Sequence, residues 1–396
     1  MAVIGKIRPV LLSVPYAEDG NMERALHLPS GWRTCSMLEI TLDNQITGLG
    51  EGYIGVFAPQ VFVAIVDLIT PHLLGREVTD INALRTAIES ITGYWSFQGA
   101  ARHVVSAFEI ALHDAAAKCL DIPVYQMLGR PSATPMALYG SGGDSTSPKY
   151  MEKEIEALAA KGINLFKIRA RNHQVDKVVW TQKAAKHYGI EVAVDMCQNL
   201  AVPGQTPDQV VDFIHAVEDA SSLPVSFLEE VLGPTQLDHL PELRARIHTR
   251  IAGGEIVTTP GELTRLVRAG SYDIAQPDAT VIGGIEAVRD VFRCAHATGV
   301  ATVVHAWGGP VCMTANYHAA AAMDAALVEF PMPRFPLREE MMVEPLVLKN
   351  GQLTLPPTPG LGVGLTEEVE RKYAFRDDAL YRCGVAHTEA GGNPWK

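Results

Sequence analysis

The sequence lacks paired cysteines, long apolar runs and a surplus of positive charge. Its six cysteines are scattered without a Cys-x-x-Cys pair, which argues against a zinc knuckle and a disulfide framework. No apolar stretch is long enough for a bilayer span or a signal peptide. The formal net charge of -12 disfavours nucleic-acid and anionic-membrane surfaces, because phosphate binding requires clustered cations. We expect a cytoplasmic protein that acts on a small molecule, with no nucleic-acid or membrane partner.

The 396 residues, 47% of them hydrophobic, suffice for two globular domains. Residues 1–130 combine strand-like and helical patterns, which predicts an α+β domain. Prolines and glycines interrupt the chain near residue 130, and residues 131–355 then alternate short apolar runs with amphipathic helices. The Pro- and Gly-rich stretch that opens residues 356–396 is expected to lead back to the first domain.

Eight apolar runs follow one another at intervals of about 22 to 35 residues. This spacing is close to that of a (β/α)8 barrel of ~250 residues divided by eight, so a parallel α/β barrel is favoured. Barrel catalysis occurs at the carboxyl ends of the strands, which makes the polar residues that end these runs the candidates. The runs are 136–140, 165–171, 190–196, 225–230, 250–255, 272–278, 300–306 and 325–330.

Carboxylates end three successive runs at Asp195, Glu229 and Glu255. Hard oxygen donors without His or Cys partners suit Mg²⁺ and fit zinc poorly. Any one such acid is as readily a helix cap, but three in a row weaken that interpretation. Glu230 points away from Glu229 because side chains alternate along a strand, and we expect it to form a structural salt bridge.

If these runs are barrel strands, cations and an imidazole are expected to face these acids. The two-residue period places Lys167, Arg169 and Arg171 on one face, which a barrel strand would turn toward its interior and toward an anionic substrate. Asp278 and His305 end adjacent runs, and an Asp can orient a His and raise its basicity. Glu329 ends the last run and is a possible hydrogen-bond donor to substrate if its pKa is raised.

Together these motifs resemble the mandelate racemase branch of the enolase superfamily. The motifs are Lys167-x-Arg169, Asp195, Glu229-Glu230, Gly254-Glu255, Pro277-Asp278 with Gly283-Gly284, and His305-Ala306-Trp307-Gly308. The resemblance implies a modified (β/α)7β barrel with an N-terminal capping domain, and Mg²⁺ held by Asp195, Glu229 and Glu255. It also gives Glu329 an electrophilic role on a substrate oxygen.

The resemblance further implies two specificity loops, near residues 15–33 and 53–58. The candidate substrate contacts are Tyr16, Trp32, Tyr53, Cys197 and Trp307. Dimers and larger rings of dimers are common in the family, so a homo-oligomer, a dimer or an octamer, is expected.

Two departures from the family pattern bear on the reaction. Arg169 stands where a second lysine is common, and Arg is a poor proton acceptor at neutral pH. Cys197 stands where the family often has Asn or His, which excludes a His acid there. The His305–Asp278 pair is then the expected base, working from one face, with Lys167 as an auxiliary acid. A single face suits elimination of water from an aldonate or aldarate, giving a 2-keto-3-deoxy acid.

Three alternatives stay open at this point. A racemase, epimerase or cycloisomerase would use Lys167 as the second acid-base group. A metal-dependent hydrolase barrel usually needs a His-x-His pair at its first strand, where this chain has Ala137 to Ser141. A non-catalytic scaffold of the same fold would be expected to have lost acidic ligands, and all three are retained.

Overall fold

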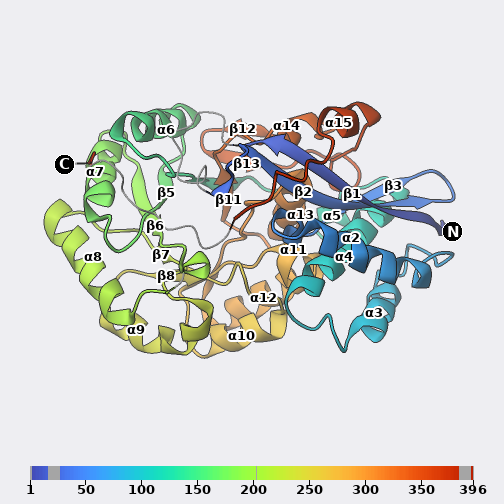
Figure 1. The fold of residues 1–396 in the computed structure, drawn as a ribbon, viewed down its shortest axis with the longest axis horizontal. Coiled ribbons are helices and arrows are strands. Elements are labelled where there is room, and N and C mark those ends of the chain that lie inside the picture. The colour runs from blue at the N-terminus through green and yellow to red at the C-terminus, as the bar shows by residue number, and fades with distance from the viewer. Residues whose placement is uncertain (1, 17–26, 202, 383–393, 396) are drawn as a thin grey trace.

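The computed structural model describes residues 2–16, 27–201, 203–382 and 394–395. It places an antiparallel three-stranded sheet with helices beside a large sheet of mostly parallel strands (Figure 1). The interval 17–26 covers most of the first expected specificity loop, so that part of the prediction lies outside the described residues. None of the helices among the described residues has the length and apolar character that a membrane crossing requires.

The first domain is a β-sheet covered by helices. The sheet order is β1-β2-β3, and its register pairs Val10 with Met37 and Leu38 with Gly50. Alternating apolar residues on β1 and β2 turn one face toward the helices. Asp80 caps α3 by accepting a hydrogen bond from Ala83 N. The elements are β1 (Ile4–Pro15), β2 (Trp32–Leu42), β3 (Thr47–Glu51), η1 (Tyr53–Val56), α2 (Pro59–Ile69), η2 (Thr70–His72), α3 (Ile81–Thr92), α4 (Ala100–Cys119) and α5 (Val124–Met127).

All eight apolar runs contain a parallel strand, which confirms the predicted barrel. Neighbouring strands pair in chain order from β4 to β10, and β11 pairs with β4. The described residues show no ladder between β10 and β11. The strands are β4 (Met136–Ser141), β5 (Leu165–Arg169), β6 (Glu191–Asp195), β7 (Leu228–Glu229), β8 (Ile251–Gly253), β9 (Ile274–Ala275), β10 (Ala301–Thr302) and β11 (Leu327–Pro331).

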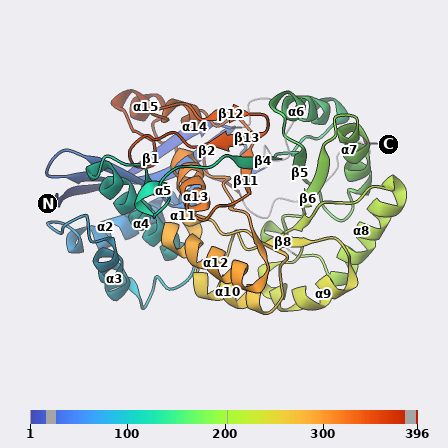
Figure 2. The same cartoon turned by 180° about the vertical axis from the view of Figure 1, so that it is seen from behind.

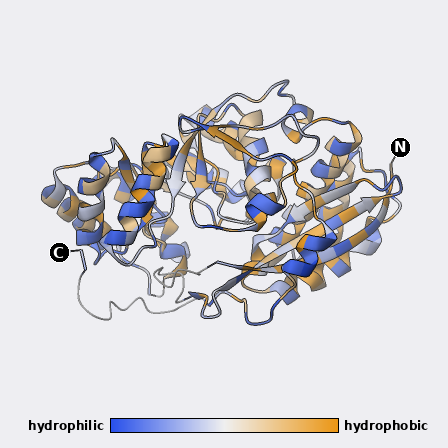
Figure 3. Ribbon diagram, turned by 90° about the horizontal axis from the view of Figure 1, so that it is seen from above, coloured by the Kyte–Doolittle hydropathy of each residue, from blue (hydrophilic) through white to orange (hydrophobic). Residues whose placement is uncertain are grey.

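Helices follow the strands and surround them (Figure 2). A capping box of Thr206 and Gln209 starts α8, and Thr259 caps α10. In Figure 3 the helices carry both hydrophobic and hydrophilic stretches, as expected when one face packs on strands. The helices are α6 (Pro148–Lys161), α7 (Val175–Lys186), η3 (Gln198–Leu200), α8 (Pro207–Ser221), η4 (Pro234–His239), α9 (Leu240–Arg246), α10 (Pro260–Arg268), α11 (Ala279–Ile282), α12 (Ile285–Thr298), α13 (Pro310–Ala322) and α14 (Leu337–Glu340).

The chain after the barrel contacts both parts of the molecule. The hairpin of β12 (Val347–Lys349) and β13 (Gln352–Thr354) adds to the start of β4 in antiparallel orientation. Helix α15 (Glu367–Lys372) then brings Glu370 to Arg8 on β1, with 2.6 Å between the guanidinium and the carboxylate. Ser13 N donates to Tyr373 O at 2.9 Å. The C-terminal segment therefore packs on the sheet of the first domain.

Candidate active site

Three acids lie side by side at the carboxyl ends of the barrel strands. Asp195 ends β6 and Glu229 ends β7, and the register places these two residues opposite each other. Glu255 follows two residues after the end of β8, the next strand. The side chains of Asp195 and Glu229 are buried, and that of Glu255 is 19% exposed. The strand order thus brings the three predicted metal ligands to one mouth of the barrel.

Each of these carboxylates is turned toward its own donors. Asp195 accepts a hydrogen bond from the backbone N of Cys197 at 2.8 Å. Glu229 pairs with Lys167 Nζ and accepts from Gln276 Nε2 at 2.5 Å. No three His, Cys, Asp or Glu side chains among the described residues are arranged to hold one metal ion. The structure makes the three acids neighbours without directing their oxygens to a single point.

The donor chemistry of this cluster fits a divalent cation. Burial raises the pKa of Glu229 to about 8, although Lys167 opposes the rise, and repulsion from Asp195 and Glu255 adds to it. Burial also raises the pKa of Glu255, and Asp195 contributes to that rise. Buried carboxylates that repel one another are the environment that a hard cation such as Mg²⁺ stabilises.

Glu230 does not form the expected salt bridge among the described residues. Its backbone has φ 44°, which interrupts the alternation of the strand directly after Glu229. The side chain instead accepts a hydrogen bond from the backbone N of Gly254 at 2.8 Å. Burial raises the pKa of Glu230 well above its ordinary value. The residue therefore links the end of β7 to the start of the loop after β8 through a hydrogen bond to the backbone.

Strand β5 supplies two cations to the mouth of the barrel. Lys167 is buried and pairs with Glu229 and, at 3.0 Å, with Glu329 Oε1. The guanidinium of Arg169 binds Asp144 Oδ1 at 2.7 Å. Arg171 was expected on the same strand face, but β5 ends at Arg169, so Arg171 belongs to the following loop. Only the first two cations of the predicted stripe are strand residues.

His305 and Asp278 form a buried pair. The Nδ1 atom of His305 lies 2.7 Å from Asp278 Oδ2, and His305 Nε2 lies 3.3 Å from Glu255 Oε2. The other oxygen of Asp278 accepts from Thr280 N at 2.8 Å and from Asn316 Nδ2 at 3.0 Å. Burial opposes a charge on His305, yet Glu255, Glu329 and Asp278 raise its pKa to about 10. Asp278 therefore fixes the ring with Nε2 directed toward Glu255.

Glu329 does not meet the condition that its predicted donor role requires. Burial would raise its pKa, but Lys167 and His305 outweigh burial and lower the pKa to about 2. Its Oε2 atom accepts a hydrogen bond from the backbone N of Ala306 at 2.6 Å. An ionised carboxylate accepts hydrogen bonds and cannot donate one. In this arrangement Glu329 neutralises Lys167 and holds the loop that follows His305.

Tyr53 and Trp307, two of the five predicted substrate contacts, touch residues of the site. The ring of Tyr53 meets that of His305 edge to face at 6.1 Å, and Trp307 lies 4.3 Å from the guanidinium of Arg169. Tyr16 is connected to them indirectly, because Arg33 lies over its ring at 5.0 Å.

The remaining two predicted contacts differ in what they touch. Arg376 of the C-terminal segment lies 4.7 Å from the ring of Trp32, which places that tryptophan against the C-terminal segment. Cys197 has φ 48° and is buried beside Asp195, with its thiol directed to the Asp195 carbonyl at 3.9 Å.

Sequence reasoning missed four polar residues of the site. Gln276 donates to Glu229, and Asn199 Nδ2 donates to Glu255 Oε1 at 2.7 Å. Asp144 binds Arg169, and Arg33 Nη1 donates to the carbonyl of Trp307 at 3.1 Å. Gln276 stands two residues before Asp278, and Asp144 three residues after β4, so the strand-end rule had the information to include both.

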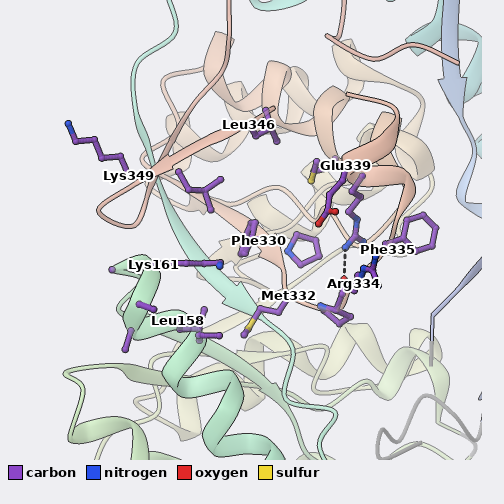
Figure 4. Close-up of a pocket in the computed structure, with 18 of the residues that line it drawn as sticks. Leu158, Lys161, Phe330, Met332, Arg334, Phe335, Glu339, Leu346 and Lys349 are labelled. Carbon is purple, nitrogen blue, oxygen red and sulfur yellow. Dashed lines mark hydrogen bonds between the residues drawn. The ribbon is translucent and has the colours of Figure 1, made fainter. Parts of the chain in front are cut away.

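A cavity of about 980 Å³ lies behind the loop that follows His305 (Figure 4). Figure 4 shows it between α6, the segment from Phe330 to Glu339 and the chain near Lys349. Arg338 lines it and donates to the carbonyls of Trp307 at 3.2 Å and Gly308 at 2.6 Å. The cavity is separate from the acidic cluster, and Arg338 supports the active-site loop from its side.

Comparisons with known proteins give matches over most of the chain. Residues 150–369 match the family described as enolase C-terminal domain-like, and residues 30–129 match the mandelate racemase/muconate lactonizing enzyme N-terminal domain. Muconate cycloisomerase 1 of Rhodococcus opacus is 28% identical over 91% of this chain and 98% of its own length. Arabinonate dehydratase of Saccharolobus solfataricus is 26% identical over 85% of this chain and 89% of its own length.

A solved structure has the same fold. The 3,6-anhydro-D-galactonate cycloisomerase from Zobellia galactanivorans superposes with a TM-score of 0.81 at 24% identity, over 94% of this chain and 99% of that chain.

Proposed function

The chain belongs to the mandelate racemase and muconate lactonizing enzyme family of the enolase superfamily, and from that premise we propose that it dehydrates an acid sugar. The reaction removes the proton next to the carboxylate of an aldonate or aldarate and then eliminates the β-hydroxyl as water. Its product is a 2-keto-3-deoxy acid. The coarser assignment is an enzyme of the enolase superfamily, and it rests on the family match and on relatives that include a cycloisomerase and a dehydratase.

One observation supports dehydration most directly. Arg169, where the family often has a second lysine, is held by Asp144 at 2.7 Å and by the ring of Trp307 at 4.3 Å. Burial opposes its charge, but Asp144 raises its pKa well above the ordinary value, so it cannot accept a proton. Proton transfer is then left to the His305–Asp278 pair, with Lys167 as a second cation. A site with one proton acceptor suits elimination better than racemisation.

The chain's residues perform the two halves of the reaction in turn. His305 Nε2 accepts the α-proton as the C–H bond breaks and an enolate forms. Lys167, whose ammonium is balanced by Glu229 and Glu329, stabilises the charge that develops on the carboxylate. Protonated His305 then returns the proton to the β-hydroxyl, the C–O bond breaks and water leaves. The resulting enol tautomerises to the 2-keto acid.

Asp195, Glu229 and Glu255 are the residues proposed to hold Mg²⁺. When bound, Mg²⁺ would act as a Lewis acid toward the enolate. It would also offset the charge of Glu255, which raises the pKa of His305. The surplus of buried carboxylates at the three strand ends supports this assignment.

A panel of aldonates and aldarates, assayed with MgCl₂ and semicarbazide, tests the proposal. We expect a keto acid to form from at least one member, with loss of activity after EDTA treatment and recovery when Mg²⁺ is added. Wild-type enzyme that forms no keto acid from any member would contradict it.

A second candidate is a cycloisomerase or an epimerase on the same scaffold. It is favoured by the 28% identity to muconate cycloisomerase 1 and requires Lys167 to act as the second acid-base group. In D₂O such an enzyme would place deuterium in recovered substrate or product without loss of water. A dehydratase would form the ketone instead.

A further inference from the structure

The backbone that follows His305 is held by side chains. Up to His305 the chain still pairs with the neighbouring segment, because His305 N donates to Pro277 O at 3.1 Å. Residues 306–309 then belong to neither a strand nor a helix, and two of these four residues are glycines, which restrict the backbone least. The position of the turn 306–309 therefore depends on the groups that bind it from outside.

Two arginines bind the same carbonyl of this turn. Arg33 of β2 donates from Nη1 to Trp307 O at 3.1 Å, and Arg338 of α14 donates from Nη2 to that oxygen at 3.2 Å. Arg338 Nη2 also donates to Gly308 O at 2.6 Å. One arginine belongs to the first domain and the other follows the last barrel strand, so the turn is held from both parts of the molecule.

Trp307 connects the turn to the cations of β5. The centroid of its ring lies 4.3 Å from the guanidinium carbon of Arg169. Arg169 binds Asp144 at 2.7 Å, and its Nε lies 3.7 Å from Oδ2 of Asp195, one of the three acids at the strand ends. A shift of the Trp307 backbone would therefore move the ring that covers Arg169.

Arg33 reaches the other side of the turn through aromatic rings. Its guanidinium carbon lies 5.5 Å from the ring centroid of Tyr53, and that ring lies 6.1 Å from the ring of His305. The rings of Tyr16 at 5.0 Å and Phe335 at 5.6 Å complete its surroundings. These distances are in the range of cation–π attraction, so the guanidinium has a defined position beside the expected base.

A buried arginine in this position is a poor choice for stability. Arg33 is 3% exposed. Burial opposes its charge, and Tyr53, Tyr16 and Glu51 act against burial to raise its pKa, but none of the described carboxylates forms an ion pair with it. Burying a charge without an ion pair costs free energy, and an apolar side chain of similar volume is often no less stable. A role in catalysis explains the cation better than a role in folding.

We propose that Arg33 is a positioning residue, which holds the Trp307 carbonyl and thereby the turn 306–309 and the ring over Arg169 in the arrangement that turnover at His305 requires. Because Arg33 comes from β2, turnover then depends on how the first domain sits on the barrel. The inference rests on the proposed function, since it needs turnover at His305, and it holds for elimination and for isomerisation alike.

Arg33→Met separates positioning from stability. The Trp307 carbonyl keeps its hydrogen bond from Arg338, so the variant leaves no buried acceptor unpaired. For the acid sugar that the substrate panel identifies, we expect kcat to fall about ten- to hundredfold, with KM and the calorimetric Kd within about twofold. The melting temperature should stay unchanged or rise.

Arg8→Met is the matched control, because it makes the same substitution in the same sheet. Arg8 lies on β1 and forms ion pairs with Glu39 at 2.8 Å and Glu370 at 2.6 Å. Since these contacts are away from the turn, Arg8→Met should leave kcat and KM unchanged, and any effect should be on the melting temperature.

Fluorine NMR follows the turn without relying on turnover. In protein labelled with fluorotryptophan, the signal of Trp307 is assigned by its loss in Trp307→Phe. We expect Arg33→Met to shift or broaden this signal, because the ring is no longer held in one position, and to leave the signals of Trp95 and Trp180 unchanged.

Four results in Arg33→Met would each overturn the inference while leaving dehydration intact. They are an unchanged Trp307 signal, an unchanged kcat, a loss confined to KM and Kd, which would make Arg33 a substrate contact, and a melting temperature that falls together with kcat, which would make its role structural. Wild-type protein that converts no acid of the panel would remove the proposed function, and the role of Arg33 in turnover with it.

Discussion

At the scale of single residues, the protonation state of His305 depends on the acids that surround it. Its Nδ1 is held by Asp278 at 2.7 Å and its Nε2 lies 3.3 Å from Glu255, and these acids and Glu329 raise its pKa to about 10 against the effect of burial. The imidazole is therefore protonated at neutral pH in this arrangement. Relief of its contact with Glu255, the first of these charges, would lower that pKa and favour its action as a base.

Replacing the imidazole tests its role directly. His305→Asn preserves much of the side-chain volume but cannot accept the α-proton, so we expect kcat to fall by about 10²–10⁴-fold. Thermal melting should change little. The kinetic control is His215→Asn, on the exposed surface of α8. Turnover retained in His305→Asn would remove His305 as the base.

Replacing its partner should have a different signature. Asp278→Asn keeps a side chain at Nδ1 but removes one of the three charges, after those of Glu255 and Glu329, that raise the pKa of His305. We expect kcat to fall by about 10–10³-fold, with the acidic limb of the kcat/KM profile displaced to lower pH because the base loses its proton more readily. Rate measurements from pH 5 to 9 check this. A lower rate with an unmoved acidic limb would assign Asp278 a purely structural role.

At the scale of elements, β3 packs closely on α4 because Gly48 and Gly50 have no side chains between the two backbones. A Cβ atom on Gly50 would lie 1.7 Å from the carbonyl oxygen of Ala107, and one on Gly48 would lie 2.3 Å from that of Ala111. Two residues of a strand span about 6.7 Å and four residues of a helix about 6 Å, so both glycines meet the same helix face. This match determines how closely the helix approaches the sheet.

The close approach predicts that a Gly→Ala substitution changes stability in opposite directions at Gly50 and at Gly261. Gly50→Ala should lower the free energy of unfolding by about 1–3 kcal/mol or more, because backbone atoms must move apart. A Cβ atom on Gly261 in α10 would have no atom within 4 Å. Gly261→Ala should therefore raise the free energy of unfolding, by up to about 0.5–1 kcal/mol. Denaturant unfolding of both variants checks the pair. Equal stability of the two would contradict the packing argument.

At the scale of the whole molecule, acids of the first domain cap helices of the barrel. Glu51 accepts hydrogen bonds from Gly309 N at 2.6 Å and Cys312 N at 2.8 Å, at the start of α13. Glu109 in α4 accepts from Ile285 N at 2.7 Å, at the start of α12. Carboxylates at helix N-termini are favourable because they meet unpaired N–H groups and the positive end of the helix dipole. These caps fix the first domain over the barrel mouth.

The junction should make stability depend on pH. Burial opposes charge on both Glu109 and His113, yet their attraction lowers the pKa of Glu109 and raises that of His113. The contribution of Glu109 is present above its ordinary pKa of 4.5 and is lost as pH falls through its lowered value. That of His113 is present below 6.5 and is lost as pH rises through its raised value. The pair thus contributes most between these limits.

Melting curves of wild type and His113→Gln check this window. The difference in Tm should be largest between about pH 4.5 and 6.5 and should shrink at higher pH, with an effect on the order of 1 kcal/mol. His215→Gln should show no such dependence, since His215 is exposed. A difference in Tm that is constant from pH 4 to 9 would show that the pair does not titrate with folding.

Much of this architecture was predictable, since strands of a parallel barrel are buried on both faces and read as apolar runs. The same rule placed Asp195, Glu229 and His305 at one mouth, because parallel strands end on the same side. It failed for Glu230, where a positive φ ends the strand alternation. It carried no information on the charge of Glu329, whose pKa Lys167 lowers from a strand two places away.

The sequence by itself determined the order of strands and the chemical identity of the groups at their ends, because both are local properties of short segments. Only the tertiary structure decided which of these groups meet. The pairing of Arg169 with Asp144 and the hydrogen bond of Arg33 to the carbonyl of Trp307 join segments distant in the chain. No spacing rule specifies such contacts, since they depend on how helices, loops and the C-terminal segment pack on the finished barrel.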